Sequence, residues 1–199
     1  MRALYLLAAC GGVLFASPAL AQGVELSYGA AANLGVSDGD TSFTVEGEVT
    51  ASYNGFFAGI WAETVDGGTY DLDIELSAGY AFALGTAEIG LTYTAYFTDD
   101  DYDTQSIELG VGVPVSDMIT LGSAASYDID NEVWDLSVGF EATPIDKVTI
   151  AALIGDDGTG TYWEAGASYA LTDSAFVGLL YEDSDYDVET VTFSIGFAF

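Results

Sequence analysis

The feature that most constrains this chain is a regular alternation of large apolar side chains with small or polar ones. The C-terminal segment shows it most clearly, because Val191, Phe193, Ile195, Phe197 and Phe199 alternate with Thr, Ser, Gly and Ala. A period of two places the two sets on opposite faces of a β-strand. The chain is therefore expected to form strands that each have one bulky apolar face and one small face.

Twelve such segments can be recognised, each close to the roughly 9–11 residues that a tilted transmembrane strand requires. They span residues 24–34, 43–53, 56–64, 72–82, 88–97, 106–113, 118–127, 134–141, 147–155, 163–169, 175–182 and 190–199. Residues 56–64 and 118–127 are less regular, and Phe57 and Trp61 could face either way. An even number of strands with dense turn signals predicts an all-β fold, a transmembrane antiparallel up-and-down β-barrel of about 12 strands.

The connections between these segments alternate in character. One set is short and lies at residues 54–55, 84–86, 114–117, 143–146 and 172–174. The other set is acidic and lies around residues 38–40, 66–68, 99–103, 128–132, 156–157 and 183–187. Bacterial barrels have short periplasmic turns and longer extracellular loops, so the acidic set is expected on the extracellular side.

A soluble β-sandwich would also show alternation, and the placement of charge decides between the two folds. The chain has 32 Asp and Glu residues against 2 Lys and Arg, and none of the acids falls in the middle of the apolar face. Carboxylates buried in a soluble core without bases would be very unfavourable, whereas they suit a water-filled lumen. Aromatic residues such as Tyr28, Trp134 and Tyr169 lie near the strand ends, as expected at lipid headgroups.

The small-residue face carries the candidate functional residues. Its acids are Glu25, Glu46, Glu48, Asp73, Glu75, Glu88, Glu108, Asp135, Glu141 and Glu164. Rings of acids attract cations and repel anions, so the sequence predicts a porin-like channel for passive diffusion of small cationic or neutral solutes. The alternative is a structural or surface-interaction barrel without significant conductance.

The acidic loops suggest a second role. Carboxylates at short spacing could hold Ca²⁺ or Mg²⁺ through oxygen ligands and bridge to lipopolysaccharide. The candidates are Asp99, Asp100, Asp101, Asp103, Asp183, Asp185 and Asp187. None of them matches an EF-hand pattern, and solvated anionic loops are the simpler interpretation.

Composition argues against enzymatic chemistry. Paired carboxylates could hydrolyse glycosides, but among 32 acids such pairs are expected by chance. The sequence has no histidine, so neither a Ser-His-Asp triad nor a histidine metal site can form. No phosphate-binding loop is present, and a net charge of −30 argues against nucleic-acid binding. We therefore expect no enzymatic activity and no organic cofactor.

Residues 1–21 are typical of a cleaved secretory signal peptide, which leaves 22–199 as one barrel domain. Arg2 precedes an apolar run from Ala3 to Phe15, and the segment ends in Ala19-Leu20-Ala21. A lipoprotein signal at Cys10 is the alternative. The expected location is the outer membrane of a Gram-negative bacterium, with membrane lipid and lipopolysaccharide as partners.

Two further patterns concern family and assembly. The alternation that ends in Phe199 resembles the C-terminal signal by which outer-membrane barrels engage their assembly machinery. Residues 55–62 (GFFAGIWA), 71–80 (DLDIELSAGY) and 88–93 (EIGLTY) together resemble the TorF-type porin family of proteobacteria. The resemblance covers about a third of the chain and implies a channel. The sequence departs from the family's aromatic-Arg-Gly motif, because residues 33–43 contain no arginine.

Overall fold

The chain forms a closed antiparallel barrel of twelve strands, as predicted. The structure is a computed structural model that describes residues 24–65, 71–99, 101–186 and 188–199, so the proposed signal peptide at 1–21 lies outside the described residues. The strands are β1 (Glu25–Ser37), β2 (Asp40–Tyr53), β3 (Phe56–Thr64), β4 (Leu72–Leu84), β5 (Ala87–Thr98), β6 (Tyr102–Ser116), β7 (Ile119–Asp128), β8 (Val133–Ile145), β9 (Val148–Asp156), β10 (Thr161–Ala170), β11 (Ala175–Ser184) and β12 (Thr190–Ala198). No helix long and apolar enough to cross a bilayer occurs in this part of the chain.

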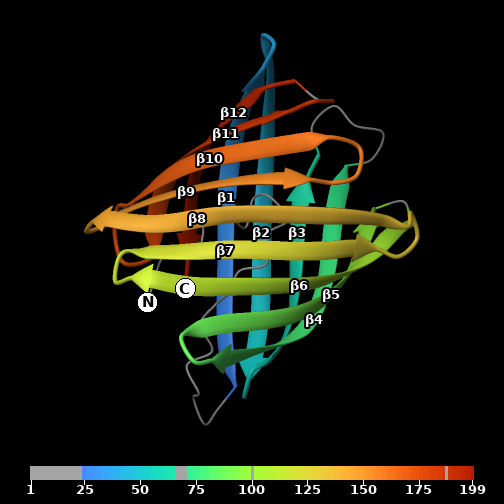
Figure 1. The fold of residues 1–199 in the computed structure, drawn as a ribbon. Coiled ribbons are helices and arrows are strands. Elements are labelled where there is room, and N and C mark those ends of the chain that lie inside the picture. Colours follow the sequence, from blue (N-terminus) through green and yellow to red (C-terminus); the bar gives the residue numbers. More distant parts are fainter. Residues whose placement is uncertain (1–23, 66–70, 100, 187) are drawn as a thin grey trace.

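Each strand pairs with its neighbours in sequence, and β12 closes the barrel against β1. Tyr28 and Phe199 exchange backbone hydrogen bonds of 3.1 and 2.9 Å at this seam, and their rings stack with centroids 5.1 Å apart. In Figure 1 the strands nearest the viewer, β6–β9, run across β1–β3 behind them. Strands on opposite walls of a barrel cross in this way because they are tilted to its axis. Closure leaves no strand edge unpaired.

The alternation sorts side chains between the inside and the outside of this barrel. Thr92 on β5 is only 4% exposed, whereas its neighbours Leu91 and Tyr93 are 53% and 42% exposed. No large side chain among the described residues is fully buried, so the barrel has no conventional hydrophobic core. Most of the small residues face inward, and most of the large apolar residues form an outer surface.

Turn chemistry explains the tightest connections. Asp38-Gly39 and Asn54-Gly55 have positive φ at both positions, 45° and 89° in the first and 50° and 85° in the second. This is the conformation of a two-residue type I′ hairpin turn, which Asn-Gly and Asp-Gly favour. These residues fix the register of β1–β2 and β2–β3.

The sequence placed two turns too early. Residues 114–117 and 143–146 were expected as turns, but β6 continues through Pro114 to Ser116 and β8 continues through Pro144 to Ile145. The pairing shifts beside each proline, between Pro114 and Ser116 and between Ala142 and Ile145. Proline lacks a backbone donor, and a bulge accommodates it within a strand instead of ending the strand. The turns themselves lie one to three residues later, at 117–118 and 146–147.

Candidate pore lining

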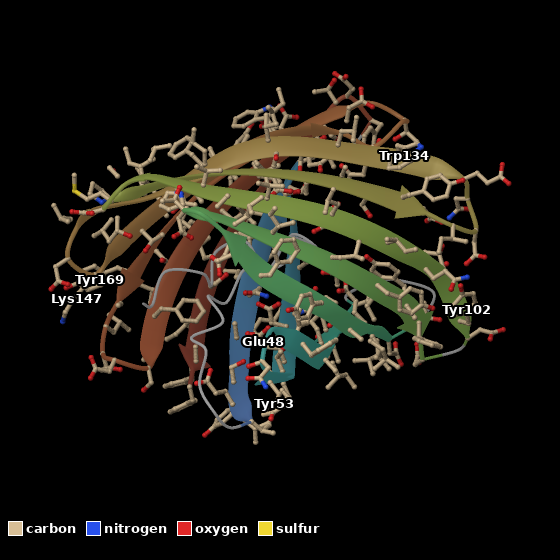
Figure 2. The ribbon with its side chains drawn as sticks, turned by 60° about the horizontal axis from the view of Figure 1, so that its bottom comes forward. Glu48, Tyr53, Tyr102, Trp134, Lys147 and Tyr169 are labelled. Carbon is tan, nitrogen blue, oxygen red and sulfur yellow. The ribbon has the colours of Figure 1, made fainter. Side chains whose placement is uncertain are left out.

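The barrel has two distinct ends, which differ in the length and charge of their connections. The short-turn end carries the β2–β3, β4–β5, β6–β7, β8–β9 and β10–β11 connections together with the start of β1 and the end of β12. The acidic-loop end carries the other connections. Figure 2 shows Tyr102 and Trp134 at one end, and Tyr169 and Lys147 at the other.

Paired aromatic rings lie on the outside of the barrel near both ends. At the acidic-loop end, Trp163 stacks on Tyr181 with centroids 4.8 Å apart, and Tyr127 lies 4.9 Å from Trp134. Near the short-turn end, Phe56 lies 4.7 Å from Tyr80. Two girdles of this kind, with exposed aliphatic residues between them, are typical of transmembrane barrels.

All ten acids predicted for the lumen lie on the inward face. They come from β1 (Glu25), β2 (Glu46, Glu48), β4 (Asp73, Glu75), β5 (Glu88), β6 (Glu108), β8 (Asp135, Glu141) and β10 (Glu164). Each alternates with an outward apolar residue, and Figure 2 shows Glu48 inside the barrel. The interior is therefore acidic on most of its strands.

The structure adds Glu63 on β3 and Glu182 on β11 to this set. The sequence did not predict Glu63, because residues 56–64 carry bulky side chains at both odd and even positions. The pattern therefore does not indicate which face of the strand points inward. The structure turns Phe57, Trp61 and Glu63 inward and leaves Phe56 and Ile60 exposed at the outside. In β7, whose sequence pattern is also irregular, Ile119 and Leu121 face outward and are 38% and 48% exposed.

Several of these acids lie directly opposite one another. Glu46 pairs with Glu63 across β2–β3, and Glu63 pairs with Asp73 across β3–β4. Glu164 pairs with Glu182 across β10–β11. Like charges in directly opposed positions destabilise a sheet. The one basic residue after position 2 is Lys147, in the β8–β9 turn at the short-turn end.

Neutral donors hold part of this acidic wall in place. The Asn33 Nδ2 group lies 3.3 Å from Glu46 Oε1 and 3.4 Å from Glu63 Oε1. Thr44 donates its hydroxyl to Glu63 Oε1 at 2.5 Å, and Trp61 Nε1 donates to Glu46 Oε2 at 3.0 Å. Amide, hydroxyl and indole donors orient carboxylates without supplying a compensating positive charge.

A cavity of about 320 Å³ opens at the acidic-loop end of the interior. Its lining includes Asp135, Tyr162, Glu164, Glu182 and Thr190. Tyr162 donates its hydroxyl to Asp135 Oδ1 at 2.9 Å. Carboxylates from β8, β10 and β11 therefore line this cavity.

The loop acids proposed as metal ligands do not assemble into a site within the described residues, where no group of three or more acids lies close enough to hold an ion. Asp99, Asp101 and Asp185 instead accept backbone hydrogen bonds from Asp71, Tyr102 and Thr161. Asp103 lies on β6, and Asp183 on β11 lies opposite Trp163. Asp100 and Asp187 fall outside the described residues. Binding of Ca²⁺ or Mg²⁺ at these loops stays a prediction.

Asp157 organises the β9–β10 loop and gives a pH prediction. Slight burial raises its pKa, but hydrogen bonds from Thr159, Tyr186 and Gly160 outweigh this effect and lower the pKa from 3.8 to about 2. A depressed carboxyl pKa stabilises the folded loop above the unfolded pKa, and this contribution is lost as the pH falls from about 4 towards 2. We expect an NMR titration of the Asp157 carboxyl carbon in micelles to give a midpoint near 2. Tyr186→Phe removes one donor and should raise that midpoint, and an unchanged midpoint would contradict the assignment.

Comparison with known proteins supports the fold. No family model matches the chain, and no curated protein resembles it closely enough to be recognised as a relative. Among solved structures, the chain is similar to the KdgM porin, with a TM-score of 0.72 and 10% identity over 86% of this chain and 99% of that one. The NanC porin gives 0.64 and 12% over 86% and 98%, and a Rhodopseudomonas blastica porin mutant gives 0.54 and 10% over 89% and 100%. At these identities the likeness shows a porin-type barrel fold.

Proposed function

We propose that this protein is an outer-membrane channel for passive diffusion of small solutes and that its lumen prefers cations. The observation that carries the proposal is the acidic inward face, which places carboxylates from nine strands around the interior, with no basic side chain on the inward face of the described strands. Water-filled interiors with rings of one charge select ions of the opposite sign.

The outer surface supports insertion into a membrane. Leu109, Leu136 and Ile195 are 48%, 55% and 53% exposed on three different strands. Contiguous apolar surface of this kind is a liability in water, and in a bilayer it is the surface that contacts lipid. The outer membrane is the compartment that the porin-type fold and the proposed signal peptide both favour. The seam residue Phe199 is the proposed contact for assembly machinery, and the TorF-type resemblance stays a prediction.

One structural neighbour defines a useful contrast. A KdgM porin structure is described in complex with disordered oligogalacturonate, and it matches this chain with a TM-score of 0.68 and 10% identity. Each galacturonate unit carries a carboxylate, so an oligogalacturonate is a polyanion. The acidic lumen of the present chain should repel such a ligand, and we therefore expect a cargo of opposite or neutral charge in a similar barrel.

Planar-bilayer recording tests this proposal. The protein, refolded in detergent, is added to one side of a bilayer with a KCl gradient across it. We expect discrete conductance steps and a reversal potential of the sign set by K⁺, with no block by added oligogalacturonate. A reversal potential of the sign set by Cl⁻ would contradict the cation preference, and heat-unfolded protein is the control for membrane leakage.

If the same recording showed no conductance steps, the result would favour the second candidate, a structural barrel without useful conductance. The observation on its side is that Phe57, Trp61, Tyr162 and Phe176 project from the inward face. Side chains fill the interior of an eight-stranded barrel, and these rings reduce the open space in this wider one. How these rings lie is therefore central to whether the interior is open.

A further inference from the structure

Three of the inward aromatic side chains lie directly opposite a glycine on a neighbouring strand. Phe57 on β3 pairs with Gly79 on β4, Tyr162 on β10 pairs with Gly155 on β9, and Phe176 on β11 pairs with Gly196 on β12. The three pairs lie on separate parts of the barrel wall. The interior thus repeats one arrangement, an aromatic side chain beside a residue that has no side chain.

The rings occupy the space that a side chain at these glycines would need. A Cβ atom at Gly79 would lie 2.4 Å from Phe57 Cζ, one at Gly155 would lie 2.3 Å from Tyr162 Cζ, and one at Gly196 would lie 2.6 Å from Phe176 Cζ. These separations are far below ordinary van der Waals contact. Each ring therefore rests on the backbone of the adjacent strand.

Tyr162 shows the direction in which such a ring extends. Its side chain starts on β10, passes over Gly155 on β9 and donates its hydroxyl to Asp135 Oδ1 on β8, at 2.9 Å. A side chain that spans three consecutive strands runs around the wall and does not cross the bore. The glycine in the middle strand makes this path possible.

We propose that Gly79, Gly155 and Gly196 act as seats that hold the Phe57, Tyr162 and Phe176 rings against the wall, and that these seats set the conductance of the pore. The inference rests on the proposed channel function. A ring displaced from its seat turns into the lumen, where it narrows the path for hydrated ions. The glycines act through the rings and are positioning residues.

Glycine on the inward face does not by itself imply a seat. Gly122 on β7 has no other atom within 4 Å of the position where its Cβ would lie, and Gly112 on β6 has only Thr120 Cγ2, at 3.9 Å. No neighbouring ring covers the backbone at these two glycines. The three covered glycines are therefore distinguished by their aromatic neighbours and not by their position on the inward face.

Gly155→Ala is the sharpest test, because the three atoms nearest to its Cβ all belong to Tyr162. At Gly79 and Gly196, backbone oxygens of Leu91 and Ala30 also lie within 2.8 Å, so substitutions there strain the sheet as well. We expect Gly155→Ala to lower single-channel conductance by roughly a third to a half, as a ring enters the bore. Gly122→Ala adds the same methyl group to an open wall and should conduct like the wild type.

A double variant separates ring displacement from general damage. Gly155→Ala combined with Tyr162→Ala should conduct like Tyr162→Ala alone, because no ring remains to be displaced. Tyr162→Phe keeps the ring and removes the hydroxyl, which isolates the bond to Asp135. Folding of every variant is checked by heat-modifiable mobility on gels.

The outcomes are distinguishable. Wild-type conductance in Gly155→Ala, or a loss that persists in the double variant, would overturn the seat proposal while leaving the channel intact. A wild-type protein that never conducts would instead overturn the proposed function on which the seats depend.

Discussion

Replacement of Glu46 and Glu63 by Gln together with Asp73 by Asn should lower the K⁺/Cl⁻ permeability ratio by roughly threefold to tenfold at 0.1 M salt. These three acids lie opposite one another across β2, β3 and β4. Their charges add at one place on the wall, so their removal has a larger effect than removal of three scattered acids. The reversal potential in a KCl gradient measures the change directly.

The structure explains why this triple variant should fold. Gln can still accept from the Thr44 hydroxyl and the Trp61 indole, which now donate to Glu63 and Glu46. The substitutions also remove like-charge repulsion between directly opposed residues. Refolding yield and thermal stability are therefore expected to equal or exceed those of the wild type.

A matched control removes three acids outside the bore. Asp38, Asp117 and Asp146 lie in turns between strands, and each can be changed to Asn. The net charge of this control equals that of the lumen variant, but its permeability ratio should stay near the wild-type value. Equal effects of the two triple variants would mean that total charge, and not the lumen wall, sets selectivity. At 1 M salt the effect of the lumen variant on the permeability ratio should shrink, because the Debye length falls from about 10 Å to about 3 Å.

Much of this architecture could be predicted from the sequence because a barrel wall is one residue thick. Alternation in segments such as β12 predicts directly which side chains lie on the outer face of the barrel and which lie on the inner face. The ten predicted lumen acids lie inward for this reason. The Asn54-Gly55 dipeptide likewise identifies its turn without any knowledge of the rest of the fold.

The facing of β3, the ends of β6 and β8 and the register between strands could not be predicted from alternation. In β3 both faces carry large apolar side chains, Phe56 and Ile60 outside and Phe57 and Trp61 inside, so the pattern of hydrophobicity does not distinguish the two faces. The prolines at 114 and 144 predict turns from sequence alone, because the bulges that accommodate them depend on pairing with the partner strand. The pairing of Phe57 with Gly79 could not be predicted either, because the register between two strands depends on both strands and on the turn that joins them.

The second large effect concerns two adjacent alanines in the middle of β7. Ala125 lies outward between Leu109 and Leu136, which are 48% and 55% exposed. Ala124 lies inward between Gly110 and Ser137. The two positions share a residue type and a strand, and they differ in the face of the barrel wall on which they lie.

Arginine at each position should therefore have opposite consequences. Ala125→Arg places a charge against hydrocarbon and should lower the free energy of unfolding by about 2–4 kcal/mol. Ala124→Arg places the same charge on the acidic inner face, and if the interior is water-filled as proposed, this variant should fold with little loss. Urea unfolding in phospholipid vesicles, followed by tryptophan fluorescence, measures the difference.

The tolerated variant gives a second readout. Arginine at Ala124 faces the same interior as Glu108 and Asp135 on the two adjacent strands, so it should reduce cation preference while leaving folding intact. If Ala124→Arg destabilised the barrel as much as Ala125→Arg, the interior would be dry and packed, and the channel proposal would fail. If instead Ala125→Arg were harmless, the outer face would not contact lipid. The pair thus tests the two faces of the wall with one substitution, and each result has only one physical origin.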